Sequence, residues 1–290
     1  MAGWSKTWTW FDGAWHEGNP MLMGPRDHAF WLGSSVFDGA RGFQGVLPDI
    51  DLHAERVNNS ALALGMEPTK QVGEIIELTK EGMGKFAADE AVYIRPMYWA
   101  TKDGPGVIDA DPTSTQFCLC MFEAPMAPEG ASNTLTLSPF RRPTLETMPV
   151  NAKAGCLYPN NARASKEAKA RGFDNAIVLD ALGNVAELTS ANVFMVKNGE
   201  VFTPFWNGTF LNGITRQRVI KLLRDAGYKV HEALLSYKDF LEADEIFSTG
   251  NYSKVVPVRQ IDDRELGIGP VAQKARALYF EFSFAQPFTY

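Results

Sequence analysis

The sequence Val150-Asn-Ala-Lys-Ala-Gly-Cys156 places a lysine among small residues, directly after a strand-like stretch. Lysines normally stand on solvated faces among polar neighbours. Here Ala152, Ala154 and Gly155 leave space around the Lys153 side chain. Because a desolvated lysine favours the free amine, which is a nucleophile able to form a Schiff base, Lys153 is a candidate catalytic residue.

A carboxylate follows this lysine inside an apolar stretch. Glu187 lies in Asn184-Val-Ala-Glu-Leu-Thr-Ser-Ala-Asn-Val-Phe194, which is typical of a strand. Burying an unpaired charge is costly, so a carboxylate here needs a partner, and a protonated pyridine nitrogen would serve. The alternative is a carboxylate on an exposed face of the strand.

Two further stretches suit the binding of an anion. The turn Phe210-Leu-Asn-Gly-Ile-Thr-Arg216 leads into a helix that begins near Thr215, and free N–H groups at a helix start bind anions. Phe247-Ser-Thr-Gly-Asn-Tyr-Ser253 places small hydroxyl residues around a glycine. Thr215 equally suits a helix cap, and the second stretch equally suits a plain turn. Arg56, on an expected helix, can clamp a phosphate with its forked guanidinium or stand in solvent.

Composition and charge narrow the class of protein. Hydrophobic residues make up 45% and charged residues 21% of the chain, values that are ordinary for soluble proteins. The net charge of -6 argues against a nucleic-acid surface, which needs clustered positive charge. The three cysteines lack metal-ligand spacing, so we expect neither a disulfide framework nor a metal site. With no long apolar segment, we expect a cytoplasmic protein that does not associate with a membrane.

A seam of prolines and small residues, Glu123-Ala-Pro-Met-Ala-Pro-Glu-Gly-Ala-Ser132, divides the chain. It predicts an N-terminal domain over 1–125, a linker over 126–133 and a C-terminal domain over 134–290. Helices and strands mix without strict alternation, which favours α/β domains of the α+β type. Helices are expected over 53–64, 74–86, 161–171 and 215–226. Strands are expected over 8–15 (a hairpin), 91–98 (cut short by Pro96), 117–122, 134–137, 175–179, 185–196 and 201–202.

Seen in order, the motifs form a longer pattern that covers nearly the whole chain. They are Gly33-Ser-Ser-Val-Phe-Asp-Gly-Ala-Arg41, His53-Ala-Glu-Arg56, Tyr93-Ile-Arg-Pro96, Ala152-Lys-Ala-Gly155, Ala186-Glu-Leu-Thr-Ser-Ala-Asn-Val-Phe194, Leu211-Asn-Gly-Ile-Thr-Arg216, Ser248-Thr-Gly250 and Pro257-Val-Arg259. This layout resembles the class IV aminotransferases, the fold-type IV pyridoxal-phosphate enzymes, and within them the branched-chain amino acid aminotransferases. The resemblance implies a smaller N-terminal α/β domain, a larger barrel-like C-terminal domain, and pyridoxal 5'-phosphate (PLP) as cofactor.

The resemblance also implies residue roles. Lys153 would carry the cofactor as a Schiff base and shuttle the proton, and Glu187 would keep the pyridine nitrogen protonated. The other implied cofactor-binding residues are Arg56, Ile214 and Thr215 for the phosphate, Tyr158 for the ring oxygen, and Asn251. The implied substrate-binding residues are Leu32, Phe37, Tyr93, Arg95 and Tyr252, and no metal is expected.

The chain departs from the family pattern at pocket positions. Leu32 stands where the family usually has a tyrosine, which removes a hydroxyl from the substrate pocket. Asn251-Tyr-Ser253 replaces the usual Thr-Ala-Ala, which changes the expected contact to the phosphate and fills space. The stretch Lys102-Asp-Gly-Pro-Gly-Val107 differs as well. These changes leave the cofactor chemistry in place, but they leave the identity of the substrate undetermined.

The leading hypothesis is an aminotransferase that moves the amino group of a branched-chain or other apolar L-amino acid to 2-oxoglutarate by a ping-pong mechanism. A transaminase for D-amino acids or (R)-amines, suggested by Leu32 and Tyr252, is the alternative, and an enzyme like aminodeoxychorismate lyase is a third. A dimeric binding protein that has lost its cofactor is disfavoured because Lys153 and Glu187 are both present. The resemblance implies a homodimer. The N-terminal aromatic residues would lie either at its interface or in the core of the domain.

Overall fold

Contacts within the chain define two units in the computed structural model, which describes residues 3–287. The segment that carries Lys153 belongs with unit 1, although the sequence places it inside the expected C-terminal range. Over the described residues, unit 1 comprises residues 3–126, 152–156 and 286–287, and unit 2 comprises Ala127–Asn151 and Leu157–Ala285.

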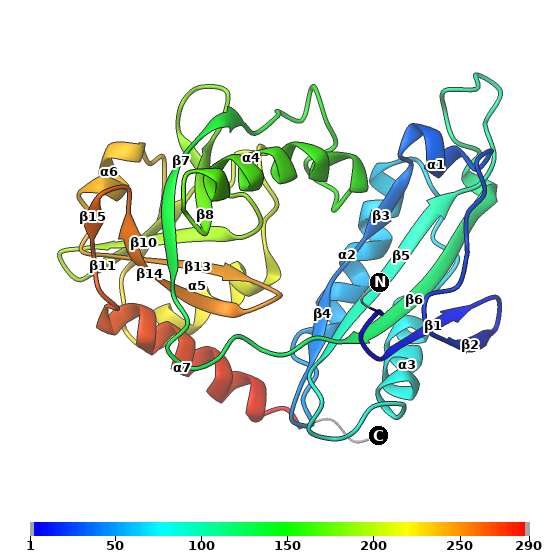
Figure 1. Cartoon of the computed structure of the whole chain (residues 1–290), viewed down its shortest axis with the longest axis horizontal. Helices are drawn as coiled ribbons and strands as arrows, with labels where there is room; N and C mark the ends of the chain where they lie inside the picture. Colours follow the sequence, from blue (N-terminus) through cyan, green and yellow to red (C-terminus); the bar gives the residue numbers. More distant parts are fainter. Residues whose placement is uncertain (1–2, 288–290) are drawn as a thin grey trace. The chain divides into compact units, whose positions relative to one another are not determined.

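Unit 1 is built on an antiparallel sheet of six strands within the described residues (Figure 1). The order is β2-β1-β6-β5-β3, and β4 also pairs with β5. The predicted N-terminal hairpin is confirmed, with Asp12 and Gly13 both at positive φ in its turn. The strands are β1 (Thr7–Phe11), β2 (Ala14–Glu17), β3 (Ser35–Phe37), β4 (Ala40–Gly42), β5 (Val92–Ala100) and β6 (Thr115–Glu123).

The prediction that Pro96 cuts its strand short is wrong, because β5 runs through it to Ala100. The N–H of Asp38 donates to the Pro96 carbonyl at 3.0 Å, so the proline nitrogen also faces Asp38. Asp38 lies in the break between β3 and β4. The N–H that Pro96 lacks would have pointed at the break between β3 and β4. No hydrogen bond between β5 and β6 is lost, and their pairing continues past Pro96.

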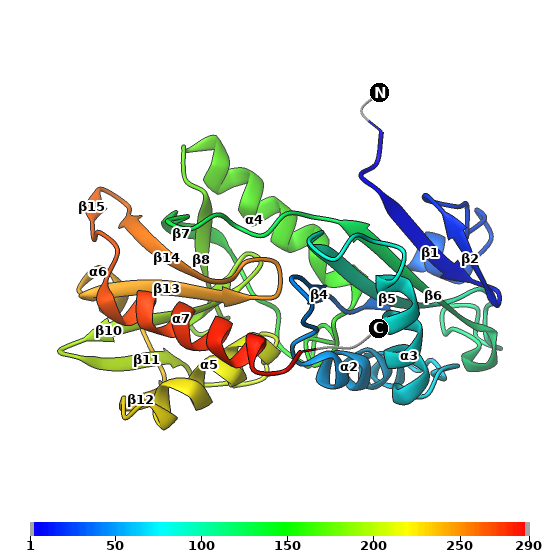
Figure 2. The same ribbon diagram turned by 90° about the horizontal axis from the view of Figure 1, so that it is seen from below.

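Helices α2 and α3 pack on this sheet (Figure 2). Helix α2 buries Ala54, Val57 and Ala61, whose spacing places them on one face. Helix α3 begins two residues before the predicted position because Gln71 and Glu74 form a capping box. The helices of the described part of unit 1 are α1 (His28–Leu32), α2 (Ile50–Ala63) and α3 (Val72–Met83), with a 3-10 turn at Pro112–Ser114.

Unit 2 contains a mixed sheet of nine strands over the described residues, in the order β12-β11-β10-β13-β14-β7-β8-β9, with β15 on β14. Strands β7 and β8 are parallel to their neighbours on the β14 side, whereas β9 returns antiparallel. The strands are β7 (Asn133–Arg141), β8 (Asn175–Leu179), β9 (Val185–Leu188), β10 (Asn192–Lys197), β11 (Glu200–Pro204), β12 (Val230–Ala233), β13 (Glu245–Gly250), β14 (Lys254–Ile261) and β15 (Arg264–Glu265).

Alternate residues of the central strands pack into two apolar layers, one on each face of the sheet. Phe194 of β10 and Phe247 of β13 stack with ring centroids 4.8 Å apart on the face that α5 and α7 cover. Val193 and Ile246 point into the layer on the other face. Burying a leucine or valine contributes about 1.5–3 kcal/mol, so these layers hold the sheet and helices together. The helices of the described part of unit 2 are α4 (Tyr158–Ala170), α5 (Ile214–Asp225), α6 (Tyr237–Leu241) and α7 (Pro270–Phe284), and a 3-10 turn over Gly155–Leu157 precedes α4 in the chain.

The single strand predicted over 185–196 is wrong. The chain turns after β9, where the N–H of Leu188 bonds the carbonyl of Ala191 at 2.8 Å, and returns as β10. Strand β8 has the predicted bounds, and α5 begins one residue before the predicted start. The turn was hidden because Thr189-Ser190 interrupts the apolar pattern only briefly.

Candidate active site

Lys153 is held in unit 1 through its backbone. Its N–H donates to the Ser60 hydroxyl of α2 at 3.0 Å, and its carbonyl accepts the N–H of Phe37 at 3.1 Å. The side chain is half-buried, and Nζ lies 4.8 Å from the centre of the Phe37 ring. The structure thus brings together the predicted catalytic lysine and Phe37, a predicted substrate residue.

The small residues around Lys153 let its segment lie against β3. Ala154 forms a β-bridge with Val36, and both Ala152 and Ala154 are buried. A Cβ on Gly155 would come within 2.8 Å of the Ser35 hydroxyl oxygen, closer than real contacts allow. The space that the sequence suggested around the lysine stem is therefore filled by close backbone packing.

A buried charge network fixes Arg56. Asp38 is fully buried and accepts from Arg56 Nε at 2.6 Å, from Arg56 Nη2 at 2.9 Å, and contacts His53 Nδ1 at 2.7 Å. Burial opposes ionisation of Asp38, but the charges and hydrogen bonds of Arg56 and His53 outweigh it and hold the pKa of Asp38 well below its ordinary value. The guanidinium of Arg56 is consequently held in one orientation by a carboxylate in the middle of the Gly33–Arg41 motif.

Tyr93 and Arg95 lie on one face of β5, two residues apart. The Arg95 guanidinium carbon lies 5.3 Å from the centre of the Tyr93 ring and 4.9 Å from that of Phe122, which stacks on Tyr93. Arg95 Nε is buried and makes no hydrogen bond within residues 3–287. Leu32, at the end of α1, is 37% exposed. The face therefore offers a cation beside a pair of stacked aromatic rings.

In unit 2, Glu187 is buried on β9 and held by an arginine that the sequence had not singled out. Arg142 Nε lies 3.2 Å from Glu187 Oε1 and also donates to the carbonyl of Thr209 at 3.1 Å. Arg142 Nη1 donates to Asn161 Oδ1 at 2.5 Å, and Asn192 Nδ2 lies 3.4 Å from Glu187 Oε2. This pairing offsets the cost of burying the carboxylate and fixes its direction. The alternative of an exposed strand face is wrong.

Asn192 ties β10 to the start of α5. Its Nδ2 donates to the carbonyl of Leu211 at 3.0 Å, and a Cβ on Gly213 would lie 2.2 Å from its Oδ1. A side chain at position 213 would displace the Asn192 amide from this position. Ile214 and Thr215 then form the first turn of the helix, and both are buried. The predicted anion site at a helix start thus has the required backbone geometry.

The turn between β13 and β14 carries further buried donors. The hydroxyl of Thr249 is buried without a hydrogen-bond partner in the described structure. Asn251 Oδ1 accepts from Lys254 Nζ at 2.8 Å, whereas Asn251 Nδ2 is buried and makes no hydrogen bond there. Tyr252 is 55% exposed. Unpaired buried donors are rare in proteins, so these two call for an acceptor from outside the chain, such as a ligand, an ion or a water molecule.

The predicted residues fall into two groups. Lys153, Phe37, Arg56, Leu32, Tyr93 and Arg95 belong to unit 1, and Tyr158, Glu187, Ile214, Thr215, Asn251 and Tyr252 belong to unit 2. Tyr158 is the first residue of α4 and is half-buried. Sequence reasoning did not single out Asp38, Arg142 or Lys254, whose side chains contact Arg56, Glu187 and Asn251, respectively. For Arg142 the available signal was a pair of arginines before Pro143 at the end of a strand.

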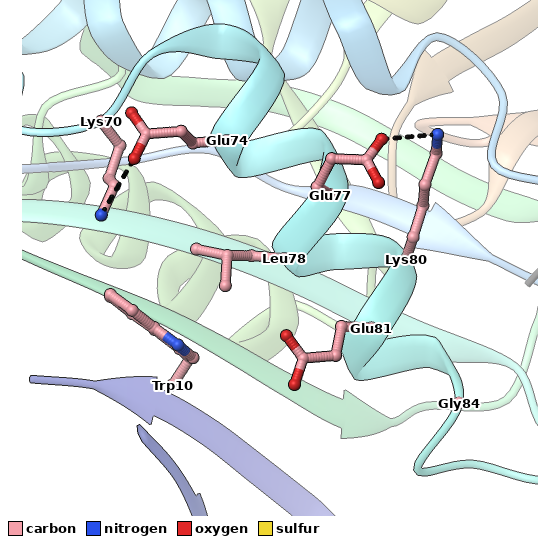
Figure 3. Close-up of a pocket in the computed structure, with 8 residues that line it drawn as sticks. All are labelled: Trp10, Lys70, Glu74, Glu77, Leu78, Lys80, Glu81 and Gly84. Carbon is pink, nitrogen blue, oxygen red and sulfur yellow. Dashed lines mark hydrogen bonds and ion pairs between the residues drawn. The ribbon is translucent and has the colours of Figure 1, made fainter. Parts of the chain in front are cut away.

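A surface pocket of unit 1 lies elsewhere, over α3 (Figure 3). Its two lysines are paired within it, Lys70 with Glu74 at 3.1 Å and Lys80 with Glu77 at 2.8 Å. It contains none of the predicted site residues, so it is not the candidate active site. Among the described residues, no group of three or more His, Cys, Asp or Glu side chains is arranged to hold a metal. None of the helices there is long and apolar enough to cross a bilayer.

Comparisons with known proteins show the family to which the chain belongs. The chain matches the model of the family described as amino-transferase class IV over residues 35–261. It is 33% identical over 265 residues to a probable branched-chain-amino-acid aminotransferase of Aquifex aeolicus (strain VF5), covering 87% of this chain and 85% of the relative.

Two solved structures extend the likeness to the fold. An aminotransferase from Brucella abortus bound to PLP is similar with a TM-score of 0.95 and 58% identity, over 96% of this chain and 99% of that chain. The Escherichia coli branched-chain amino acid aminotransferase is similar with a TM-score of 0.89 and 28% identity, over 96% and 95%. The predicted fold class, a two-domain fold-type IV architecture of α/β type, is thereby confirmed, and the chain belongs to the class IV aminotransferases, a family of PLP enzymes.

Proposed function

We propose that this class IV aminotransferase transfers the amino group of a branched-chain or other apolar L-amino acid to 2-oxoglutarate, with Lys153 carrying its PLP cofactor. The observation that carries the proposal is the buried carboxylate of Glu187, which Arg142 holds in a fixed direction. The names of the relatives, branched-chain aminotransferases at about 30% identity, support the substrate class.

The residues present fit the cofactor. Its phosphate would be held by the first turn of α5, by Asn251 and by Arg56, since a dianion favours a helix start and a guanidinium. The orphaned hydroxyl of Thr249 supplies a further buried donor. Glu187 would face the ring nitrogen, and Tyr158 would contact the ring oxygen.

Glu187 and Lys153 would have separate roles in the reaction. The bound cofactor supplies an electron sink for the negative charge that develops at the substrate's α carbon. Glu187 holds a proton at the ring nitrogen, which that role requires. Lys153, once the donor's amine has replaced it, moves the proton at the α carbon as general base and acid. Because the amino group stays with the enzyme between the two half-reactions, ping-pong kinetics follow.

Both substrates must enter one pocket, although one is apolar and the other is a dicarboxylate. Arg95, beside the stacked rings of Tyr93 and Phe122, suits both, because its guanidinium can pair with the distal carboxylate and the aromatic rings can pack against an aliphatic chain. The buried Nε of Arg95, which makes no hydrogen bond in the described structure, favours a carboxylate ligand.

A half-reaction screen tests the proposal. The PLP-loaded enzyme is mixed with one amino donor at a time, and the absorbance of the bound cofactor is followed. L-leucine, L-isoleucine, L-valine and L-glutamate should each react, and the Lys153→Ala variant should fold normally and show no turnover. Full-rate transamination by Lys153→Ala, or no response to these four donors, would contradict the proposal.

Leu32 and Tyr252, both partly exposed, favour a second candidate function. Leucine in place of the family's tyrosine and tyrosine in place of its alanine reshape the pocket, which suits a D-amino acid or an (R)-amine. D-alanine and (R)-1-phenylethylamine with pyruvate belong in the same screen. Release of pyruvate without an amino acceptor would instead indicate an enzyme like aminodeoxychorismate lyase.

We also propose a homodimer in the cytoplasm. Helix α1 exposes Phe30 at 62% and Trp31 at 50%, and such aromatic side chains are enriched at interfaces. The free cysteines Cys118, Cys120 and Cys156 suit a reducing compartment. Sedimentation equilibrium of wild type and of a Phe30→Ser, Trp31→Ser variant tests the assembly, and a monomeric wild type would refute it.

A further inference from the structure

A lysine lies fully buried at the start of β14. Lys254 is 1% exposed, and its Nζ donates to Asn251 Oδ1 at 2.8 Å and lies 5.5 Å from the centre of the Tyr279 ring. Its backbone adopts a positive φ of 63°, which is uncommon for a residue with a side chain. Burying an ammonium and holding this backbone both cost free energy, so the arrangement calls for a function.

The ammonium settles which way round the Asn251 amide lies. An ammonium has donors and no acceptor, so only the carboxamide oxygen can face it. Asn251 Nδ2 therefore points away from Lys254. This nitrogen is buried and makes no hydrogen bond among residues 3–287. Its N–H groups are left for an acceptor that is not part of the chain.

A second donor points to the same kind of acceptor. Thr249 is 1% exposed, and its hydroxyl has no hydrogen-bond partner in the described structure. It pairs across the sheet with Asn192, so the two side chains share a face. Asn192 bonds Leu211 and approaches Gly213, the residue before α5. The Thr249 hydroxyl thus faces the side of the sheet where α5 begins.

We propose that Lys254 is a positioning residue for the cofactor's phosphate, because it fixes the Asn251 amide so that Nδ2 donates to a phosphate oxygen. The inference rests on the proposed function and deepens it. Asn251 replaces the family's hydroxyl donor with an amide, and an amide is useful only if its nitrogen end is presented. Lys254 performs that selection and adds a buried positive charge near the dianion.

The test compares PLP with pyridoxal, which lacks the phosphate, on the full chain freed of cofactor. Asn251→Asp keeps an oxygen for Lys254 and replaces the donor with a carboxylate. Lys254→Met removes the ammonium at similar length. Lys274→Met, an exposed lysine on α7 of the same unit, is the matched control. Dissociation constants come from the absorbance of the bound ligand, and melting temperatures with inorganic phosphate give a second readout.

Asn251→Asp should weaken PLP binding by about 10- to 100-fold, the range for losing a charge-assisted hydrogen bond and gaining a like charge. Lys254→Met should weaken it by about 10-fold and reduce stabilisation by inorganic phosphate. Pyridoxal binding should stay within about two-fold of wild type in both variants, and the control should match wild type throughout.

Equal losses for PLP and pyridoxal would overturn the inference, because they would reflect general damage. An Asn251→Asp variant that binds PLP like wild type would also overturn it. If Lys254→Met does not fold, the PLP and pyridoxal affinities of Asn251→Asp alone test the inference. A wild type that prefers pyridoxal to PLP would instead remove the proposed function itself.

Discussion

Replacing Arg142 by methionine should destabilise the chain strongly and weaken cofactor binding at the same time. Arg142 is 5% and Glu187 7% exposed, so the variant would leave a buried carboxylate without its guanidinium. Breaking a buried ion pair by removing one partner costs about 3–5 kcal/mol. The loss of the Arg142 hydrogen bonds to Thr209 and Asn161 places the expected change at the upper end of that range.

A matched control comes from an exposed pair in the same unit. Lys221 and Asp225 lie 2.7 Å apart on α5, with side-chain exposures of 64% and 57%. Lys221→Met removes the same charge, and because solvent screens this pair, the expected cost is about 0.3–0.5 kcal/mol. The two variants should therefore differ by several kcal/mol although each loses one cation.

The assay is urea unfolding of the cofactor-free chain followed by tryptophan fluorescence, with PLP titrations on the same samples. A double-mutant cycle with Glu187→Gln separates the ion pair from the other bonds of Arg142, and the coupling free energy should exceed about 1 kcal/mol. A cost below about 1 kcal/mol for Arg142→Met, or a coupling free energy near zero, would refute the reasoning.

Three further predictions concern residues of both units. Asp38→Asn should cost about 2–4 kcal/mol near neutral pH. Since the pKa of Asp38 is lowered from its ordinary 3.8, this contribution is present above that pH and is lost as the pH falls, so urea titrations in acid should show a smaller gap between wild type and variant. Gly213→Ala should displace Asn192 and lower stability by about 1–3 kcal/mol in thermal melts, whereas Gly73→Ala, in open space on α3, should not destabilise. Arg95→Met should raise the KM for 2-oxoglutarate by about tenfold or more and change that for L-leucine little, which steady-state kinetics would check.

Local patterns in the sequence predicted helices α2, α3, α4 and α5, and an apolar face is a local signal. No element was predicted for α1, α6, α7, β3, β4 or β12 to β15, so the C-terminal part of the sheet in unit 2 and its longest helix were missed. Val219 and Leu223 of α5 lie four residues apart and are both fully buried, as the periodicity indicated. The prediction that Pro96 ends its strand is wrong because the effect of a proline depends on a neighbour from another part of the chain. Whether a proline ends a strand depends on what stands opposite its missing N–H, and here the break at Asp38 stands there.

The residues of the candidate site also differ in whether local sequence could predict them. Lys153 and Glu187 stand in short motifs, so their positions could be predicted. Arg142 could not, because it reaches Glu187 only through the strand order β7-β8-β9, in which the Arg142 N–H bonds Leu179 and Val178 pairs with Glu187. The sequence motifs thus pointed to the groups that we propose meet a ligand, whereas the groups that hold them in place depend on the fold.

The buried charges of unit 2 also give the proposed cofactor a direction. Glu187, held by Arg142, presents a negative group on β9, and Lys254 with the first turn of α5 presents positive charge and N–H donors. PLP carries the opposite polarity, with a cationic ring nitrogen when protonated and a phosphate dianion. A cofactor turned end for end would place its phosphate against Glu187 and its ring nitrogen against Lys254, and both contacts would be repulsive. If these residues have the roles proposed above, the charges of unit 2 alone would fix which end of the cofactor faces Glu187 and which faces Lys254, without a contribution from the covalent bond to Lys153.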